Sequence, residues 1–236
     1  MANLKELDEV LKKNSNAEKA KLLSGFFKTG KGEYGEGDVF LGINVPKQRE
    51  IAREFEDLGM GEIQRLLDSK VHEKRMIALF ILVDRFKKET ETGKKEIFDF
   101  YLKNTRNINN WDLVDLSSHK IVGGFLIDKD REILYKLAKS NHLWEKRIAI
   151  ISTFAFIREN DFSDSLKIAE ILLNDKHDLI HKAVGWMLRE IGKKDEKKLT
   201  GFLDKYSGKM PRTMLRYAIE KFDETRRKEY LNKERE

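Results

Sequence analysis

The sequence predicts an all-α protein, and two observations support this fold class. Only two prolines, Pro46 and Pro211, occur in 236 residues, so few positions stop a helix from continuing. Most of the chain carries apolar residues at the three- and four-residue spacing of an amphipathic helix, in segments joined by short polar turns. No segment shows strand-like alternation of useful length, and the chain is therefore expected to be helical apart from its loops.

The predicted helices follow one another closely along the chain. The clearest patterns span residues 4–13, 45–58, 60–69, 72–88, 94–104, 130–140, 144–160, 164–175, 177–194 and 211–223. Residues 17–28 also have a helical pattern, and another helix is expected to begin near Trp111. The exception is TGKGEYGEGDVFLG, residues 29–42, which is predicted to be a glycine-rich loop.

Two of these segments resemble each other and indicate a repeat. HEKRMIALFIL (72–82) and WEKRIAIISTF (144–154) both carry Glu-Lys-Arg followed by an apolar helix. Charged residues recur about every 35 positions, and they are Arg75, Asp112, Arg147, Lys182 and Arg216. Helix pairs at this period are typical of an α-solenoid, and the lack of the Trp, Gly, Tyr and Pro pattern of TPR repeats favours the HEAT type. We therefore expect one HEAT-like repeat domain over residues 1–236, with the recurring charges in a mostly basic concave groove. The alternative is an ordinary helix bundle whose helix pairs happen to have similar lengths.

Composition excludes several classes of protein. The chain has no cysteine, which excludes disulfides and cysteine-based zinc sites, and its five histidines show no metal-ligand spacing such as HExxH. No run of about 18 apolar residues could span a membrane, and the amphipathic start MANLKELDEVLKK does not read as a signal peptide. These features predict a cytoplasmic protein without a metal or cofactor. The net charge of +6 and pI near 9.2 are compatible with nucleic-acid binding, but charged residues make up 37% of the chain and can equally serve to solvate helix faces.

The spacing of glycines in residues 30–37 matches GxGxxG, but its context argues against a nucleotide site. The dinucleotide motif needs a strand before it and a helix directly after it, so that backbone amides meet the pyrophosphate. Here a helical segment precedes the glycines and VFLG follows them. We interpret this stretch as a loop.

The segment 177–194 contains a tryptophan that lies away from its apolar face. The apolar stripe consists of Ile180, Ala183, Val184, Met187, Leu188 and Ile191. Trp186 falls beside Lys182 and Arg189 instead of at the centre of this stripe. Such a tryptophan can pack on a neighbouring helix or stack on a nucleic acid, and this helix alone does not decide between the two.

The stretch NINNWDLVDLSSHK, residues 107–120, places an aromatic ring and a carboxylate together. Trp111 and Asp115 are four residues apart and share one face of a helix. Asp112 lies in the first turn, where an acid favours the helix dipole. Asp115 lies too far into the helix to cap it, so its carboxylate needs a partner or a cationic ligand. Two readings stay open, a salt bridge to Arg147 or a nearby lysine, and a site built to hold a positive charge.

Four stretches in this order resemble the DNA alkylation repair family, the AlkD-like HEAT-repeat DNA glycosylases. They are GEGDVFLGINVPKQR (35–49), NWDLVD (110–115), WEKRIAI (144–150) and HKAVGWMLRE (181–190). The resemblance covers nearly the whole chain. It implies a solenoid that holds duplex DNA in its concave face and hydrolyses the N-glycosidic bond of N3- or N7-alkylated purines. It also implies a base excision repair protein located in the cytoplasm, at the nucleoid in a prokaryote.

The resemblance also assigns roles to individual residues. Trp111, Asp115 and Trp186 match the family's active-site residues, and Arg147 matches its DNA-contacting arginine. Phe26 stands where some members place a tyrosine in the groove, and the missing hydroxyl is expected to alter DNA contact or lesion preference. Lys182 and Arg189, with Arg147, are expected to hold phosphates and so to give affinity with little base-sequence specificity.

The chemistry of such a lesion suits these residue types. An N3- or N7-alkylated purine is already a cation and needs no general acid before it leaves. A carboxylate can stabilise the oxocarbenium-like sugar and orient water, and tryptophan faces attract a cation. No lysine is clearly placed for strand cleavage, so a monofunctional glycosylase is expected. A monomer is expected because a solenoid closes its own core. The competing hypotheses are a catalytically silent DNA-binding relative and a HEAT-type scaffold for other proteins.

Overall fold

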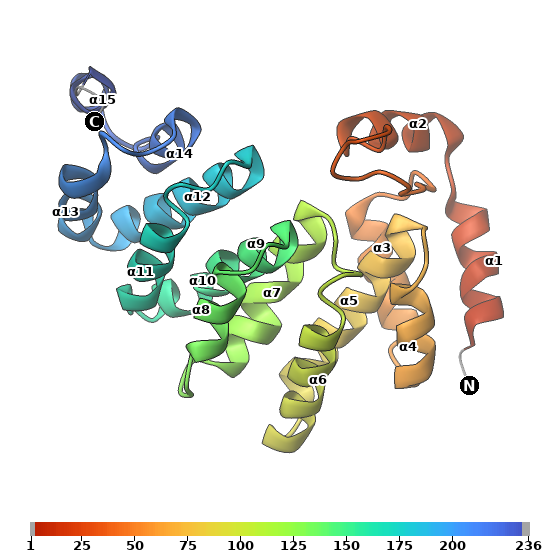
Figure 1. Cartoon of the computed structure of the whole chain (residues 1–236). Helices are drawn as coiled ribbons and strands as arrows, with labels where there is room; N and C mark the ends of the chain where they lie inside the picture. The colour runs from red at the N-terminus through yellow and green to blue at the C-terminus, as the bar shows by residue number, and fades with distance from the viewer. Residues whose placement is uncertain (1–2, 233–236) are drawn as a thin grey trace. The chain divides into compact units, whose positions relative to one another are not determined.

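The computed structural model describes residues 3–232, and regular secondary structure in this range is helical (Figure 1). The helices are α1 (Leu4–Asn14), α2 (Ala17–Phe26), α3 (Val45–Glu54), α4 (Met60–Leu67), α5 (His72–Lys88), α6 (Glu91–Lys103), α7 (Trp111–Phe125), α8 (Glu132–Ala138), α9 (Leu143–Ser152), α10 (Phe154–Arg158), α11 (Ser163–Ile171), α12 (Asp178–Lys194), α13 (Glu196–Tyr206), α14 (Arg212–Ala218) and α15 (Glu224–Asn232). Within the described range the only β-type pairing is an isolated bridge between Val39 and Val71. The predicted all-α class is confirmed.

The chain divides into two compact units, and the boundary falls between Leu113 and Val114, inside α7. The first unit contains α1 to α6 and the first turn of α7, and the second contains the rest of α7 and α8 to α15. The single repeat domain and the concave groove expected from the sequence involve both units and stay predictions.

The first unit is organised around α5. Helices α3, α4 and α6 pack against it, and the run from Met76 to Val83 is at most 1% exposed. This segment shows little polar alternation because neighbouring helices cover it on several sides, as expected for a helix that is apolar all round. Helix α5 is thus the fixed element from which the surrounding loop and helices are positioned.

The glycine-rich loop, which lies between α2 and α3 in the chain (Figure 1), is tied to the start of α5 by hydrogen bonds. Residues 29–42 form turns and not a helix, as predicted. The carboxylate of Glu73, which is 0% exposed, accepts hydrogen bonds from the backbone N–H groups of Leu41 (2.9 Å), Gly42 (2.8 Å) and Ile43 (3.3 Å). Gly42 has φ +81°, and a Cβ there would lie 2.2 Å from the carbonyl oxygen of Asn16. This position therefore requires glycine both for its backbone conformation and for the close approach to the start of α2.

The second unit is organised around α12, which packs against α9, α13 and α14. The six residues of the predicted apolar stripe on this helix are all 0% exposed. At Gly185 a Cβ would lie 2.5 Å from the carbonyl oxygen of Met214 and 2.5 Å from the Cβ of Tyr217. The absence of a side chain at Gly185 thus lets α14 approach α12 closely.

Two sequence expectations are wrong in detail. The helix predicted over 144–160 is divided into α9 and α10 at Thr153, whose hydroxyl donates a hydrogen bond to the carbonyl of Ile150 (2.7 Å). Three of the recurring charged residues expected to line a groove are buried instead, since Arg75, Asp112 and Arg147 are only 3%, 7% and 4% exposed. Each is in contact with an oppositely charged or hydrogen-bonding side chain inside its own unit. The recurrence of charged residues along the sequence indicated a repeat, but it did not predict that three of these residues are buried.

None of the helices in residues 3–232 is long and apolar enough to cross a membrane. In the same range, no group of three or more histidine or acidic side chains is arranged to hold a metal ion.

Candidate functional site

Helix α7 carries the residues that the sequence singled out, and its start is fixed by side-chain contacts. The side chain of Asn110, 0% exposed, accepts a hydrogen bond from the backbone N–H of Trp111 (2.8 Å). Asp112 lies in the first turn as expected. Its carboxylate accepts from the N–H of Leu113 (2.8 Å) and contacts Nε2 of His72 (2.9 Å). The first turn of α7 is therefore anchored to α5.

Trp111 belongs to a group of aromatic rings in the first unit. Its ring stacks on Phe27, with centroids 5.2 Å apart and planes 16° apart, and Phe27 stacks in turn on Phe40 at 5.0 Å. Phe26 meets Trp111 edge to face at 6.0 Å. Phe26 is 63% exposed, whereas Phe27 is buried. The structure thus places Phe26 beside Trp111 with most of its side chain facing solvent.

A buried charge network lies behind this aromatic group. His72 contacts Asp38 through Nδ1 (3.3 Å) and Asp112 through Nε2 (2.9 Å), while Arg75 pairs with Asp38 (2.7 Å). Burial by itself lowers the pKa of His72, but attraction to Asp112 and the hydrogen bonds to both carboxylates outweigh it, so the pKa is raised. The network links the loop residue Asp38, the start of α5 and the first turn of α7, and so holds the backbone that carries Trp111.

Asp115 lies in the second unit and is held by Arg147 of α9. Nε and one terminal nitrogen of Arg147 donate to the two carboxylate oxygens of Asp115, both at 2.8 Å. Arg147 also donates to the carbonyl of Leu179. The side chain of Arg147 is 5% exposed and that of Asp115 is 13% exposed. Of the two readings left open by the sequence, the salt bridge to Arg147 is present, and it fixes the orientation of the carboxylate.

Trp186 is connected to α7 by ring contacts through Phe154 and His119. It is half-buried on α12, and its ring centroid lies 5.9 Å from that of Phe154. Phe154 in turn meets His119 at 5.5 Å, and His119 lies one helical turn beyond Asp115 on α7. The indole N–H of Trp186 donates to Glu190 (3.1 Å). Trp186 is therefore linked through Phe154 and His119 to α7, the helix that also carries Asp115.

His119 is neutral at ordinary pH because of its surroundings. Burial, followed by the positive charges of Lys120 and Arg158, lowers its pKa from 6.5 to about 4. Between these two pH values the unfolded state binds a proton that the folded state does not. Stability contributed by neutral His119 is thus present above pH 6.5 and is lost as the pH falls towards 4.

We expect this histidine to contribute about 2–3 kcal/mol to the loss of stability on acidification. Urea unfolding of wild type and His119→Phe between pH 7 and pH 4.5 measures it, since subtraction of the two curves removes the contribution of the carboxylates. The wild type should lose more stability than the variant over this interval. Parallel curves would mean that His119 titrates normally in the folded protein.

The remaining basic residues predicted to hold DNA are engaged in ion pairs. Lys182 contacts Asp178 one turn earlier on α12 (2.7 Å). Arg189 contacts Glu220 and lies 3.6 Å from Glu190. Phosphates would have to compete with these carboxylates for both side chains.

Sequence reasoning did not find the network around His72 or the role of Glu73. A signal for the network existed in the paired segments 72–82 and 144–154. The arginine of each segment is buried and bound to an aspartate, Arg75 to Asp38 and Arg147 to Asp115. The repeat could therefore have predicted a buried ion pair at the equivalent position of each segment.

Comparison with known proteins agrees with this architecture. The family model described as DNA alkylation repair enzyme matches residues 7–222. The chain is similar to a solved structure described as a predicted DNA alkylation repair enzyme from Enterococcus faecalis, with 16% identity, a TM-score of 0.69, and coverage of 89% of this chain and 98% of that one. It is also similar to AlkD2 from Streptococcus mutans, with 18% identity, a TM-score of 0.55, and coverage of 88% and 98%. No curated protein matches the chain.

The two kinds of match carry different weight. At such low identity the solved structures speak to the fold, and they confirm the predicted class of helical repeat protein. The family model covers most of the sequence and includes all four stretches on which the resemblance was based. The chain therefore belongs to the DNA alkylation repair enzyme family.

Proposed function

We propose that the protein is a monofunctional DNA glycosylase that hydrolyses the N-glycosidic bond of N3- and N7-alkylated purines in duplex DNA. The observation that carries the proposal is the carboxylate of Asp115, held in one orientation by two hydrogen bonds from Arg147 and still 13% exposed. A carboxylate fixed in this way is preorganised to interact with a positive charge that develops nearby.

The pairing with Arg147 leaves Asp115 able to act on a substrate. Each carboxylate oxygen has two lone pairs, and the guanidinium takes one on each oxygen. In the proposal the negatively charged carboxylate faces the sugar as it gains oxocarbenium character and orients the attacking water. Arg147 in this proposal is a positioning residue for Asp115 as well as the expected contact to DNA phosphate.

The chemistry of the leaving purine decides what the site must provide besides Asp115. As water attacks C1′, the bond to the purine nitrogen breaks and its electron pair neutralises the cationic ring, while the proton of water passes to Asp115 or solvent. No acid is needed for the base to leave. The proposal assigns Trp111 and Trp186 to cation–π attraction, worth about 2 kcal/mol each when desolvated. The exposed Phe26 and the basic residues Lys182 and Arg189 are assigned to DNA contact, and recognition by lesion shape and charge is expected.

The proposal predicts that the purified protein releases free base from duplex DNA carrying 7-methylguanine or 3-methyladenine. Release is followed by chromatography of the base, and the same reactions are run on a denaturing gel without alkali or heat. We expect free base with an intact strand, since no lysine is assigned to strand cleavage. Strand scission that accompanies base release would contradict the monofunctional mechanism, and the absence of release would remove the glycosylase assignment.

A second candidate, a catalytically silent DNA-binding relative, is favoured by the same ion pair. If Asp115 serves only to hold α7 to α9 through Arg147, the site needs no further chemistry. This alternative predicts salt-sensitive duplex binding without release of any alkylated base. A scaffold for other proteins would show neither.

A further inference from the structure

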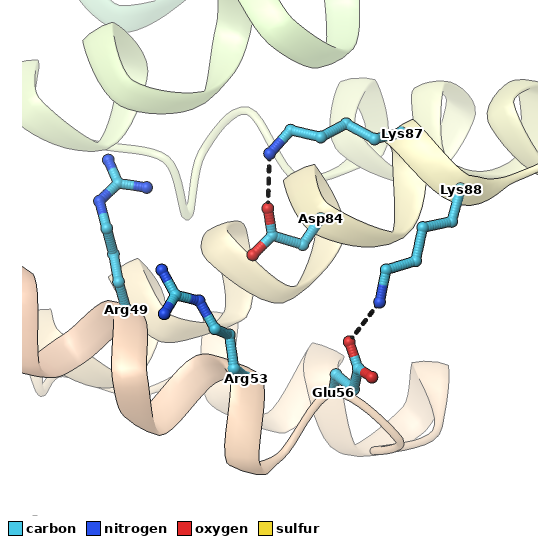
Figure 2. Close-up of a pocket in the computed structure, with 6 residues that line it drawn as sticks. All are labelled: Arg49, Arg53, Glu56, Asp84, Lys87 and Lys88. Atoms are coloured by element: carbon cyan, nitrogen blue, oxygen red, sulfur yellow. Dashed lines mark hydrogen bonds and ion pairs between the residues drawn. The ribbon is translucent and has the colours of Figure 1, made fainter.

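The first unit contains a second charged site, lined by residues other than those assigned to the reaction. A cavity of about 550 Å³ lies between α3 and α5, and Figure 2 shows the residues that line it. Its lining consists of six charged side chains, Arg49, Arg53, Glu56, Asp84, Lys87 and Lys88. Sites for drug-sized ligands are mostly apolar with a few polar groups. A lining of charged groups, four basic and two acidic, indicates an anionic ligand instead.

The two acids of the cavity are already engaged. Asp84 pairs with Lys87 one turn later on α5 (2.7 Å), and Glu56 pairs with Lys88 (2.7 Å). Both pairs are drawn as dashed lines in Figure 2. Within residues 3–232, by contrast, neither Arg49 nor Arg53 forms an ion pair with a carboxylate. The positive charge of the cavity is thus concentrated on these two guanidinium groups.

The two arginines are arranged to act together. They are four residues apart on α3 and so lie on the same face of the helix, and in Figure 2 both project into the space that Lys87 approaches from α5. The guanidinium of Arg49 lies 4.0 Å from the ring centroid of Phe80, a residue that is 1% exposed in the core of α5. This contact restrains Arg49 without neutralising it. A guanidinium held in this way presents its N–H groups in the fork geometry that matches phosphate oxygens.

We propose that Arg49 and Arg53 bind a phosphate of a DNA backbone. The inference rests on the DNA-binding part of the proposed function and adds a contact that the sequence did not predict. The basic residues that the sequence did predict are less available for this role. Lys182 and Arg189 are paired with acids of the protein itself, whereas Arg49 and Arg53 form no ion pair with a carboxylate among residues 3–232.

The test measures binding to an undamaged duplex, so that it does not depend on base release. Wild type is compared with Arg49→Gln/Arg53→Gln by fluorescence anisotropy over a range of salt concentrations. The matched control is Arg65→Gln/Arg106→Gln, which removes the same charge from two exposed arginines of the first unit that do not line the cavity. Loss of one phosphate contact should reduce the slope of log K against log salt by about 0.9. We expect this change, with a roughly tenfold weaker affinity at low salt, for the cavity variant and not for the control.

Two further measurements distinguish a DNA phosphate from a small phosphorylated ligand. Arg53→Gln alone leaves the contact between Arg49 and Phe80 in place, and it should still weaken duplex binding if the site holds DNA. Titration of wild type with inorganic phosphate, followed through the arginine side-chain NMR signals, tests for the small ligand. Duplex binding and a salt slope unchanged in the cavity variant would overturn the proposal, and saturable phosphate binding alongside unchanged duplex binding would assign the cavity to a small anion. Equal losses in the cavity variant and the control would also overturn it, because they would reflect net charge alone.

Discussion

Asp115→Asn is expected to reduce base release from alkylated duplex DNA by at least about 100-fold, the scale seen when one preorganised electrostatic group is removed from an active site. The asparagine keeps the shape of the side chain and one oxygen that can accept from Arg147. It loses the negative charge that the proposal sets against the developing positive charge of the sugar. The effect should therefore appear in the single-turnover rate at saturating enzyme more than in the affinity for DNA.

The substitution also leaves the buried Arg147 without a full counter-charge, so stability must be measured in parallel. Breaking a buried ion pair costs about 3–5 kcal/mol, and asparagine retains part of the hydrogen bonding. A matched control is Asp175→Asn, which weakens the pair between Asp175 and Lys146 in the same unit but lies outside the proposed chemistry. We expect normal base release from this control at temperatures where both variants are folded. A folded Asp115→Asn variant that releases base at the wild-type rate would show that Asp115 is only structural.

Glu73→Ala is expected to lower the free energy of unfolding by about 3–5 kcal/mol. The buried carboxylate accepts from three consecutive backbone N–H groups, those of Leu41, Gly42 and Ile43. Removal leaves these donors without an acceptor in a region from which water is excluded, and each unsatisfied group costs about 1–3 kcal/mol. The loop that carries Asp38 should lose its attachment to α5, which also weakens the network around His72.

The urea unfolding of the first unit can be monitored separately from that of the second unit. The chain has three tryptophans, and only Trp111 lies before the boundary at Leu113, so a Trp144→Phe/Trp186→Phe background reports on that unit. Glu62→Ala provides the comparison, because Glu62 accepts one exposed N–H, that of Gly59 (2.9 Å). We expect a loss of about 1 kcal/mol for this single cap. Similar losses for the two variants would mean that the loop is held by other contacts.

The helices and their buried faces could be predicted from the sequence, because their spacing is a local property. The stripe on α12 from Ile180 to Ile191 is buried as its 3.6-residue period requires, and α5 occupies the predicted residues 72–88. The break at Thr153 could not be predicted in this way. A local pattern continues across it, and the interruption comes from the backbone conformation and the hydroxyl contact to Ile150.

The candidate site was likewise predictable from the sequence only in part. The spacing of Trp111 and Asp115 follows from the helix, and the sequence named Arg147 as one partner that Asp115 could have. It did not decide between that ion pair and an open cation site, because the two residues are 32 positions apart and meet only through the packing of α7 and α9. Arg75 was similarly expected at a surface and is buried against Asp38.

The helical class, the glycine-rich loop and the family could be read from the sequence alone, since each depends on residue types at short spacing or in order along the chain. Only the folded structure shows which charged side chains form ion pairs within the protein and which remain available to a ligand. Arg147, Lys182 and Arg189 have acidic partners, whereas Arg49 and Arg53 have none among residues 3–232. The physical reason is that a charge is neutralised by neighbours in space, and the chain brings those neighbours together only when it folds.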